Sequence, residues 1–206
     1  MKKFLVLLFV SSLLSFHSFA QEASNIRPAA LGISFSLVDY TTAQRIRSSS
    51  LTSVLNKDQT ASFKEMSPAI GITYFKGLRN HIDFAGTLLA SFTNVNLEGR
   101  TGNSDAFLLE ADASVNLKML SDNYFFSPYI SAGVGFSSYD KKLGAFIPLG
   151  GGLKFNIFNE AAIYITSQYR VPVTTETGNY HFVHGFGIAG IIGKKNGPAE
   201  PSLKVP

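Results

Sequence analysis

The sequence predicts an all-β protein, an eight-stranded antiparallel up-and-down transmembrane β-barrel. Three observations predict this fold class. Apolar residues alternate with small or polar residues in eight segments, most of these segments are about 9–13 residues long, and short and long connections alternate between them. A strand in a soluble protein is typically about 5–6 residues long, whereas a strand that crosses a membrane has about 9–11. The segment lengths therefore favour a membrane protein.

The first four segments show the period of two that is typical of strands with two different faces. The predicted strands, each followed by the apolar residues that share one of its faces, are 30–39 (Leu31, Ile33, Phe35, Leu37), 68–76 (Ile70, Ile72, Tyr74), 81–93 (Ile82, Phe84, Leu88, Ala90, Phe92) and 105–118 (Phe107, Leu109, Ala111, Ala113, Val115, Leu117).

The last four segments repeat the pattern, again with one apolar face and one small or polar face. The strands and their apolar residues are 125–137 (Phe126, Ile130, Ala132, Val134, Phe136), 145–157 (Ile147, Leu149, Leu153, Phe155, Ile157), 161–171 (Ile163, Ile165, Tyr169, Val171) and 180–192 (Tyr180, Phe182, Phe186, Ile188, Ile192).

The connections between the predicted strands alternate in length. Those after the second, fourth and sixth strands are short, and those after the first, third, fifth and seventh are longer. The longest, at 40–67, is rich in Ser, Thr and charged residues. Outer-membrane barrels have short periplasmic turns and longer external loops. We therefore expect an outer-membrane location of the Gram-negative type, with both ends of the mature chain in the periplasm.

Aromatic residues gather near the predicted ends of the strands, as expected for rings at the two membrane interfaces. The outer group is Phe92, Phe107, Phe136, Tyr139, Phe146, Tyr169, Tyr180 and Phe182, and the periplasmic group is Tyr74, Phe84, Phe125, Phe126, Phe155 and Phe158.

Residues 1–20 have the three parts of a cleaved signal peptide. Lys2 and Lys3 are followed by an apolar run, and small residues precede the expected cleavage after Ala20. A transmembrane anchor is the weaker interpretation, because a spanning helix needs about 20 mostly apolar residues and serines interrupt this run. We expect residues 21–193 to form one outer-membrane β-barrel domain and 194–206 a periplasmic tail containing Pro and Lys.

The composition excludes several classes of protein. Removing Lys2 and Lys3 from the 18 basic residues leaves 16 against 14 acidic ones, a net charge of +2. These charges are scattered, whereas a nucleic-acid binder clusters them on one face, so we expect no nucleic-acid partner. The chain has no Cys, so it has neither a lipid attached to cysteine nor a disulfide framework.

The chemistry of the second face indicates which way the apolar face points. A soluble exported ligand-binding barrel would have apolar residues inside and many Lys, Glu and Arg outside. In this chain the second face is mainly Gly, Ser, Ala, Thr and Asn, which suits the narrow interior of an eight-stranded barrel. The apolar face is therefore expected to contact outer-membrane lipid, and the soluble barrel remains the further alternative.

The signal, the eight alternating strands and the segments YISAGVGF at 129–136 and GGGLKF at 150–155 together resemble the OmpA/OmpX-like outer-membrane β-barrel domains. The resemblance covers about residues 28–193 and implies a barrel with a structural or surface-interaction role through its external loops, or a narrow porin-like channel. Many family members continue into a peptidoglycan-binding domain. This chain stops at Pro206, so a peptidoglycan role is not supported by the residues present. We expect a monomer without cofactors.

Charged residues on the second face are the first candidates for a site. They are Asp83, Glu110, Asp112, Lys154 and Arg170. Because buried charges must pair to offset their desolvation, we expect Glu110 and Asp112 to pair with Lys154 or Arg170. Such a network would either plug the barrel or gate a narrow pore.

Two further groups carry basic or titratable side chains. Arg45, Arg47, Lys57 and Lys64 in the first long connection are candidates for contacts with lipopolysaccharide phosphates or another partner, although they could equally belong to a solvated loop. His181 and His184 have no serine near them in the sequence. We therefore interpret them as interfacial histidines, and we expect neither a metal site nor an enzyme.

Overall fold

The computed structural model describes residues 26–93, 106–139, 142–157, 160–174 and 179–192. The expected signal peptide at 1–20, the tail at 194–206 and the connection at 94–105 lie outside the described residues.

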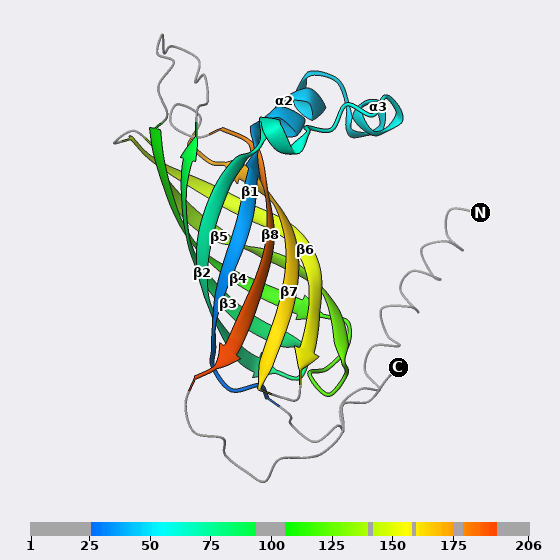
Figure 1. The fold of residues 1–206 in the computed structure, drawn as a ribbon, viewed down its shortest axis with the longest axis vertical. Coiled ribbons are helices and arrows are strands. Elements are labelled where there is room, and N and C mark those ends of the chain that lie inside the picture. The colour runs from blue at the N-terminus through cyan, green and yellow to red at the C-terminus, as the bar shows by residue number, and fades with distance from the viewer. Residues whose placement is uncertain (1–25, 94–105, 140–141, 158–159, 175–178, 193–206) are drawn as a thin grey trace, which may run out of the picture.

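Eight antiparallel strands form one closed barrel in which each strand pairs with its neighbours in sequence (Figure 1). They are β1 (Ala30–Asp39), β2 (Ser67–Arg79), β3 (Ile82–Thr93), β4 (Ala106–Lys118), β5 (Phe126–Tyr139), β6 (Lys142–Ile157), β7 (Ala161–Pro172) and β8 (His181–Ile191). Pairing of β1 with β8, from Ala30↔Ile191 to Asp39↔Phe182, closes the barrel. The predicted fold class is confirmed.

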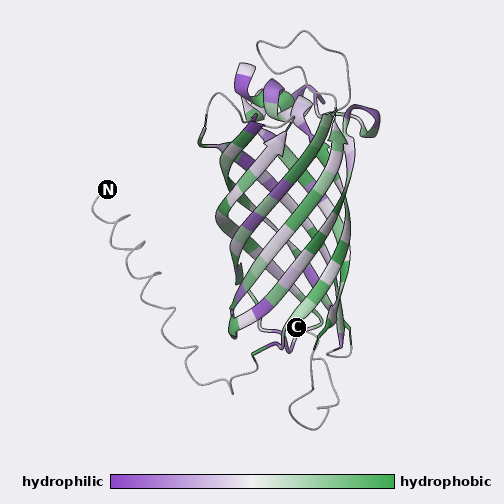
Figure 2. Ribbon diagram, turned by 90° about the vertical axis from the view of Figure 1, so that its left-hand side faces the viewer, coloured by the Kyte–Doolittle hydropathy of each residue, from purple (hydrophilic) through white to green (hydrophobic). Residues whose placement is uncertain are grey.

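The apolar face of the strands points out of the barrel. Ile33, Ile130 and Val134 are each more than 60% exposed, whereas Glu110 and Ser127 have no exposed surface. Hydrophobic and hydrophilic residues alternate along the strands in Figure 2. A protein with this exterior needs an apolar environment around it, because soluble monomers rarely expose large apolar patches. The predicted orientation is confirmed, and the alternative of a soluble barrel with an apolar interior is wrong.

Two helices and a short 3-10 helix lie between β1 and β2, where the sequence predicted only a loop. They are α2 (Tyr40–Ser48), α3 (Leu51–Asn56) and η2 (Phe63–Glu65). The Asp39 carboxylate accepts a 2.8 Å hydrogen bond from the backbone N–H of Thr42 and so caps α2. This end of the barrel is called the helix end below, and the end where β1 begins and β8 finishes is called the turn end (Figure 1).

None of the described helices is both long enough and apolar enough to span a membrane.

The connection between β5 and β6 differs from its prediction. The sequence suggested a long connection at this position, but β5 and β6 extend to Tyr139 and Lys142, which pair directly. Only residues 140–141 remain between these strands, so the alternation in length fails at this position. Ser138 and Tyr139 lie beyond the predicted end of the strand at 137, yet they continue the backbone ladder opposite Leu143 and Lys142.

Two rings assigned to the outer aromatic group point into the barrel instead. Tyr139 is 7% exposed and Phe146 is 4% exposed. The Phe146 ring occupies the space beside Gly135, where a side chain would collide with it. The outer group was therefore wrong for these two residues, because strand-end position alone does not determine the face on which a ring lies.

Candidate functional site

Four ionisable residues form a cluster inside the barrel toward the helix end. Arg170 on β7 forms ion pairs with Glu110 and, at 3.2 Å, with Asp112, both on β4. His181 at the start of β8 places Nε2 3.3 Å from Oε1 of Glu110. All four are buried. The guanidinium of Arg170 also lies 4.9 Å from the centre of the Phe146 ring. We call Glu110, Asp112, Arg170 and His181 the helix-end cluster.

A second set of charges closes the barrel near the turn end. The Lys118 ammonium lies 2.7 Å from Asp83 and 2.5 Å from Asp122. The Lys154 ammonium lies 2.9 Å from Asp83 and 3.4 Å from Asp122. Two carboxylates thus alternate with two ammonium groups in a ring, and Arg27 lies 4.0 Å from Asp122. We call these five residues the turn-end cluster.

The charges around Asp122 outweigh the effect of its burial. Burial by itself raises the pKa of a carboxyl group, but Lys154 and Lys118 lower the pKa of Asp122 below its ordinary value. Asp122 lies in the connection between β4 and β5. Because its pKa is lowered, this buried carboxylate is ionised at neutral pH. The turn-end cluster is therefore a set of paired charges of opposite sign.

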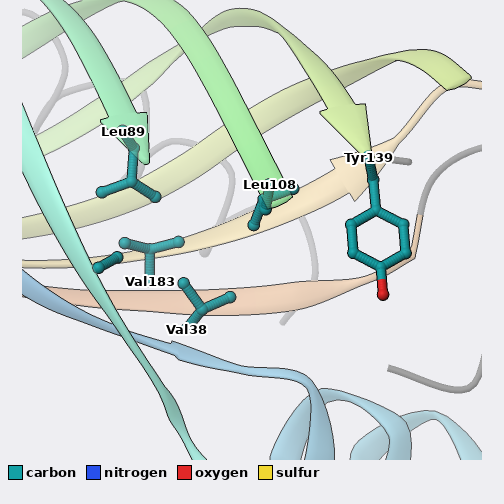
Figure 3. Packing of buried hydrophobic residues seen from close by; sticks show 6 residues of the cluster. Val38, Leu89, Leu108, Tyr139 and Val183 are labelled. Atoms are coloured by element: carbon teal, nitrogen blue, oxygen red, sulfur yellow. The ribbon is translucent and has the colours of Figure 1, made fainter. Parts of the chain in front are cut away.

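Apolar and aromatic side chains fill much of the space around these clusters. Val38, Leu89, Leu108, Tyr139 and Val183 pack together inside the barrel near the helix end (Figure 3). Phe75 and Tyr164 meet edge to face at 5.1 Å, in a second apolar group with Ala30, Ala85 and Ala189. The barrel interior is thus packed with side chains along its length, as expected for eight strands.

Small cavities lie in the described part of the interior, and two of them adjoin the clusters. The space open to the centres of water molecules is about 40 Å³ in one cavity, which Arg170, Gln168 and Thr73 help to line. It is about 10 Å³ in the other, beside Lys118 and Lys154. Since about 10–15 Å³ holds one water molecule, the cavities have room for a few waters and for no larger ligand.

The structure brings the predicted interior charges together in two sets rather than one. Arg170 lies with Glu110 and Asp112, whereas Lys154 lies with Asp83 at the other end. Sequence reasoning missed Arg27, Lys118, Asp122 and His181 as members of the clusters. Lys118 shares the face of Glu110 and Asp112 by simple alternation, so its signal was available. Arg27 and Asp122 lie outside the strands, where alternation says nothing about their direction.

The two histidines have different environments. His181 is buried in the helix-end cluster, and its ring lies 4.7 Å from that of Tyr40 on α2. Its interpretation as an interfacial histidine is therefore wrong. His184 lies on the exterior, and its Nδ1 is 2.9 Å from the hydroxyl of Ser167 on β7. No serine is near His184 in the sequence, but strand pairing brings Ser167 of the neighbouring strand directly opposite it.

The basic residues of the first connection have separate surroundings. Arg45 pairs with Glu65 at 3.1 Å and donates to the carbonyl of Gln59. The guanidinium of Arg47 lies 3.9 Å from the centre of the Tyr180 ring. Lys57, which follows the end of α3, and Lys64, in the middle of η2, are both exposed. The four residues therefore form no single cluster.

The described residues contain no group of three or more His, Cys, Asp and Glu arranged to hold a metal ion.

Neither a protein-family model nor a curated protein sequence matches the chain significantly. Among solved structures, the N-terminal β-barrel domain of Pseudomonas aeruginosa OprF is 11% identical with a TM-score of 0.52, covering 81% of this chain and 98% of that one. Neisserial surface protein A is 11% identical with a TM-score of 0.51, and the match covers 83% of this chain and 100% of that one. The outer membrane protein OprG from Pseudomonas aeruginosa is 10% identical with a TM-score of 0.51, and the match covers 81% of this chain and 98% of that one.

At these identities the likeness concerns the fold. The chain has the eight-stranded antiparallel β-barrel fold of the OmpA/OmpX-like outer-membrane proteins, as its sequence predicted.

Proposed function

We propose that the protein is an integral outer-membrane barrel without enzymatic activity, and that it has a structural or surface-interaction role through its helix end. The observation that carries this proposal is the distribution of polarity. Large apolar side chains cover the exterior of the strands, and ion pairs lie inside. Lipid is a suitable environment for this apolar exterior. The closed sheet also leaves no unpaired strand edge in the membrane. The fold likeness to outer-membrane proteins supports the same location.

The packed interior favours this role over a narrow channel. An ion crossing the barrel would have to pass both the helix-end cluster and the turn-end cluster, whose charged groups already pair with one another. The cavities between them hold only a few waters. Planar-bilayer recordings on the wild-type protein should show no steady conductance. A stable single-channel current would instead support the channel.

Contact with lipopolysaccharide is the surface interaction that the helix end favours. Lys57 and Lys64 are exposed there, and cations in this position suit phosphate groups. Reversing both charges with Lys57→Glu and Lys64→Glu should lower the amount of lipopolysaccharide that copurifies with the barrel. The matched control is Lys76→Glu, near the turn end. Equal copurification in all three proteins would contradict this contact.

Cell fractionation combined with gel mobility tests the membrane location. The full chain should remain with the outer membrane and should migrate differently before and after boiling, because folded barrels resist the detergent. Recovery of the protein from the soluble periplasm, with no change of mobility on boiling, would overturn the proposed function.

A further inference from the structure

A chain of side-chain contacts runs along the exterior between β7 and β8. Ser167 and His184 face each other across this strand pair, and Tyr169 and Phe182 form the next exterior pair toward the helix end. The rings of Tyr169 and Phe182 lie 4.7 Å apart, and those of Tyr169 and Tyr180 lie 5.9 Å apart. Arg47 of α2 covers Tyr180. We call these six residues the β7–β8 seam.

Polarity changes along the seam in the same order as along a membrane lipid. Toward the turn end, the exterior pairs next to Ser167 and His184 are Ile165 with Phe186 and Ile163 with Ile188. Toward the helix end come the aromatic rings, and the exposed Arg47 is last. Apolar residues suit acyl chains, aromatic residues suit the interface, and a guanidinium suits a phosphate group.

The Ser167–His184 pair is a polar interruption of the exterior. Other polar exterior residues such as Lys76 and Ser138 lie near strand ends, whereas Ser167 lies in the middle of β7. A polar group placed in lipid needs a hydrogen-bond partner. The 2.9 Å contact between Ser167 and His184 supplies one.

That contact leaves one hydrogen-bond donor over in either protonation arrangement. A neutral histidine carries one N–H and a serine one O–H. The mutual hydrogen bond uses one of these two donors. If the serine hydroxyl donates to Nδ1, the Nε2–H remains, and if Nδ1–H donates, the hydroxyl hydrogen remains. In a lipid environment, the matching acceptor is the carbonyl oxygen of an ester or amide that links an acyl chain.

We propose that the β7–β8 seam binds one phosphorylated lipid, with its phosphate at Arg47 and an acyl carbonyl at the Ser167–His184 pair. This inference rests on the proposed membrane location, since it needs the exterior to face lipid. It assigns the seam a ligand of defined chemistry, distinct from the contacts of Lys57 and Lys64 with lipopolysaccharide.

Native mass spectrometry of the purified, delipidated full chain tests the proposal. The probes are phosphatidic acid, diacylglycerol with the same acyl chains, and inorganic phosphate. Wild-type protein should retain one phosphatidic acid. Arg47→Gln should lower that retention about tenfold, the effect of losing a hydrogen bond between charged groups, and should leave diacylglycerol retention unchanged.

A second variant addresses the polar pair. Ser167→Ala combined with His184→Phe should lower the retention of both lipids about fivefold, the effect of losing one hydrogen bond. Lys76→Gln and Ser138→Ala are the matched controls and should retain wild-type binding, because Lys76 is exposed near the turn end, away from the seam. The difference in mobility between boiled and unboiled samples shows that each variant is folded.

Three outcomes would overturn the proposal. The first is equal retention of phosphatidic acid by wild type and both seam variants. The second is an equal loss in the Lys76→Gln control, and the third is binding of inorganic phosphate as strong as that of the lipid. If the wild-type protein fractionates with the outer membrane but retains no lipid, the inference alone fails. If it does not reach the membrane, the proposed function fails.

Discussion

At the scale of single residues, the interior charges stabilise the barrel as sets. Glu110 has no exposed surface and Arg170 is only 1% exposed, so each depends on the other for its stability. Breaking a buried ion pair by removing one partner is strongly destabilising, whereas replacing the whole set by uncharged groups costs much less. Arg170 therefore stabilises the folded barrel by pairing with two buried carboxylates.

Replacing Arg170 by Met should lower the free energy of unfolding by about 3–5 kcal/mol, because Glu110 and Asp112 would lose their shared cation. The folded fraction can be followed in urea through the gel mobility of unboiled samples in lipid vesicles. The control combines Arg170→Met with Glu110→Gln and Asp112→Asn. This triple variant should be more stable than the single one, and the opposite order would contradict the account.

At the scale of elements, the connection between β1 and β2 is an ordered extension of the barrel. Asp39 caps α2, and the hydroxyl of Thr42 accepts a 2.8 Å hydrogen bond from the N–H of Ala61. Tyr40 rests on His181 of the helix-end cluster. These contacts hold the start and the end of the connection together at the helix end.

Loss of the cap should loosen α2. Asp39→Ala should cost about 1 kcal/mol of helix stability, which corresponds to about fivefold faster hydrogen exchange at the first amides of α2. Ser50→Ala is the matched control, because Ser50 caps α3 through the N–H of Ser53 at 3.1 Å. It should accelerate exchange in α3 only. Identical exchange profiles for the two variants would contradict separate capping.

Acid should weaken the hydrogen bonds between Glu65 and Ser62 that hold η2. Hydrogen bonds from the backbone and side chain of Ser62, helped by Arg45, lower the pKa of Glu65 below its ordinary value of 4.5. A carboxyl group with a lowered pKa stabilises the folded state above its ordinary pKa, and this contribution is lost as the pH falls through the lowered value. The amide resonance of Ser62 in micelles should shift below pH 4.5. Glu65→Gln should abolish the shift, and an unchanged titration in this variant would contradict the assignment.

At the scale of the whole molecule, the barrel reverses the polarity of a soluble domain, with a belt of apolar side chains outside and charges inside. The interior charges lie at two levels, joined by packed apolar and aromatic side chains rather than by open space. Two separate barriers to ions follow from this arrangement.

Opening the lumen should therefore require changes at both levels. Arg170→Ala and Lys154→Ala should each leave the barrel without conductance in planar bilayers, since one cluster remains intact. The double variant should conduct ions. A current through either single variant comparable to that of the double variant would show that one cluster alone closes the barrel.

Alternation along each strand was sufficient to predict eight strands, their exterior faces and most of the charged interior residues. Side chains at every second position of a strand lie on the same face of the sheet. The interior positions of Glu110, Asp112 and Arg170 could therefore be predicted without knowledge of their contacts. Alternation could not predict α2, the extension of β5 and β6 to Tyr139 and Lys142, or the direction of Asp122, because these features do not depend on a repeat of two residues.

The sequence by itself thus determined the barrel, its strand number and its outward apolar face, because these depend on a local repeat of two residues. Only the tertiary structure decided which charges meet. The pairing of Arg170 with Glu110, the contacts of Asp83 with Lys118 and of Asp122 with Lys154, and the contact of Ser167 with His184 join residues from different strands or connections. Their distances depend on strand register and barrel closure, which no local pattern contains.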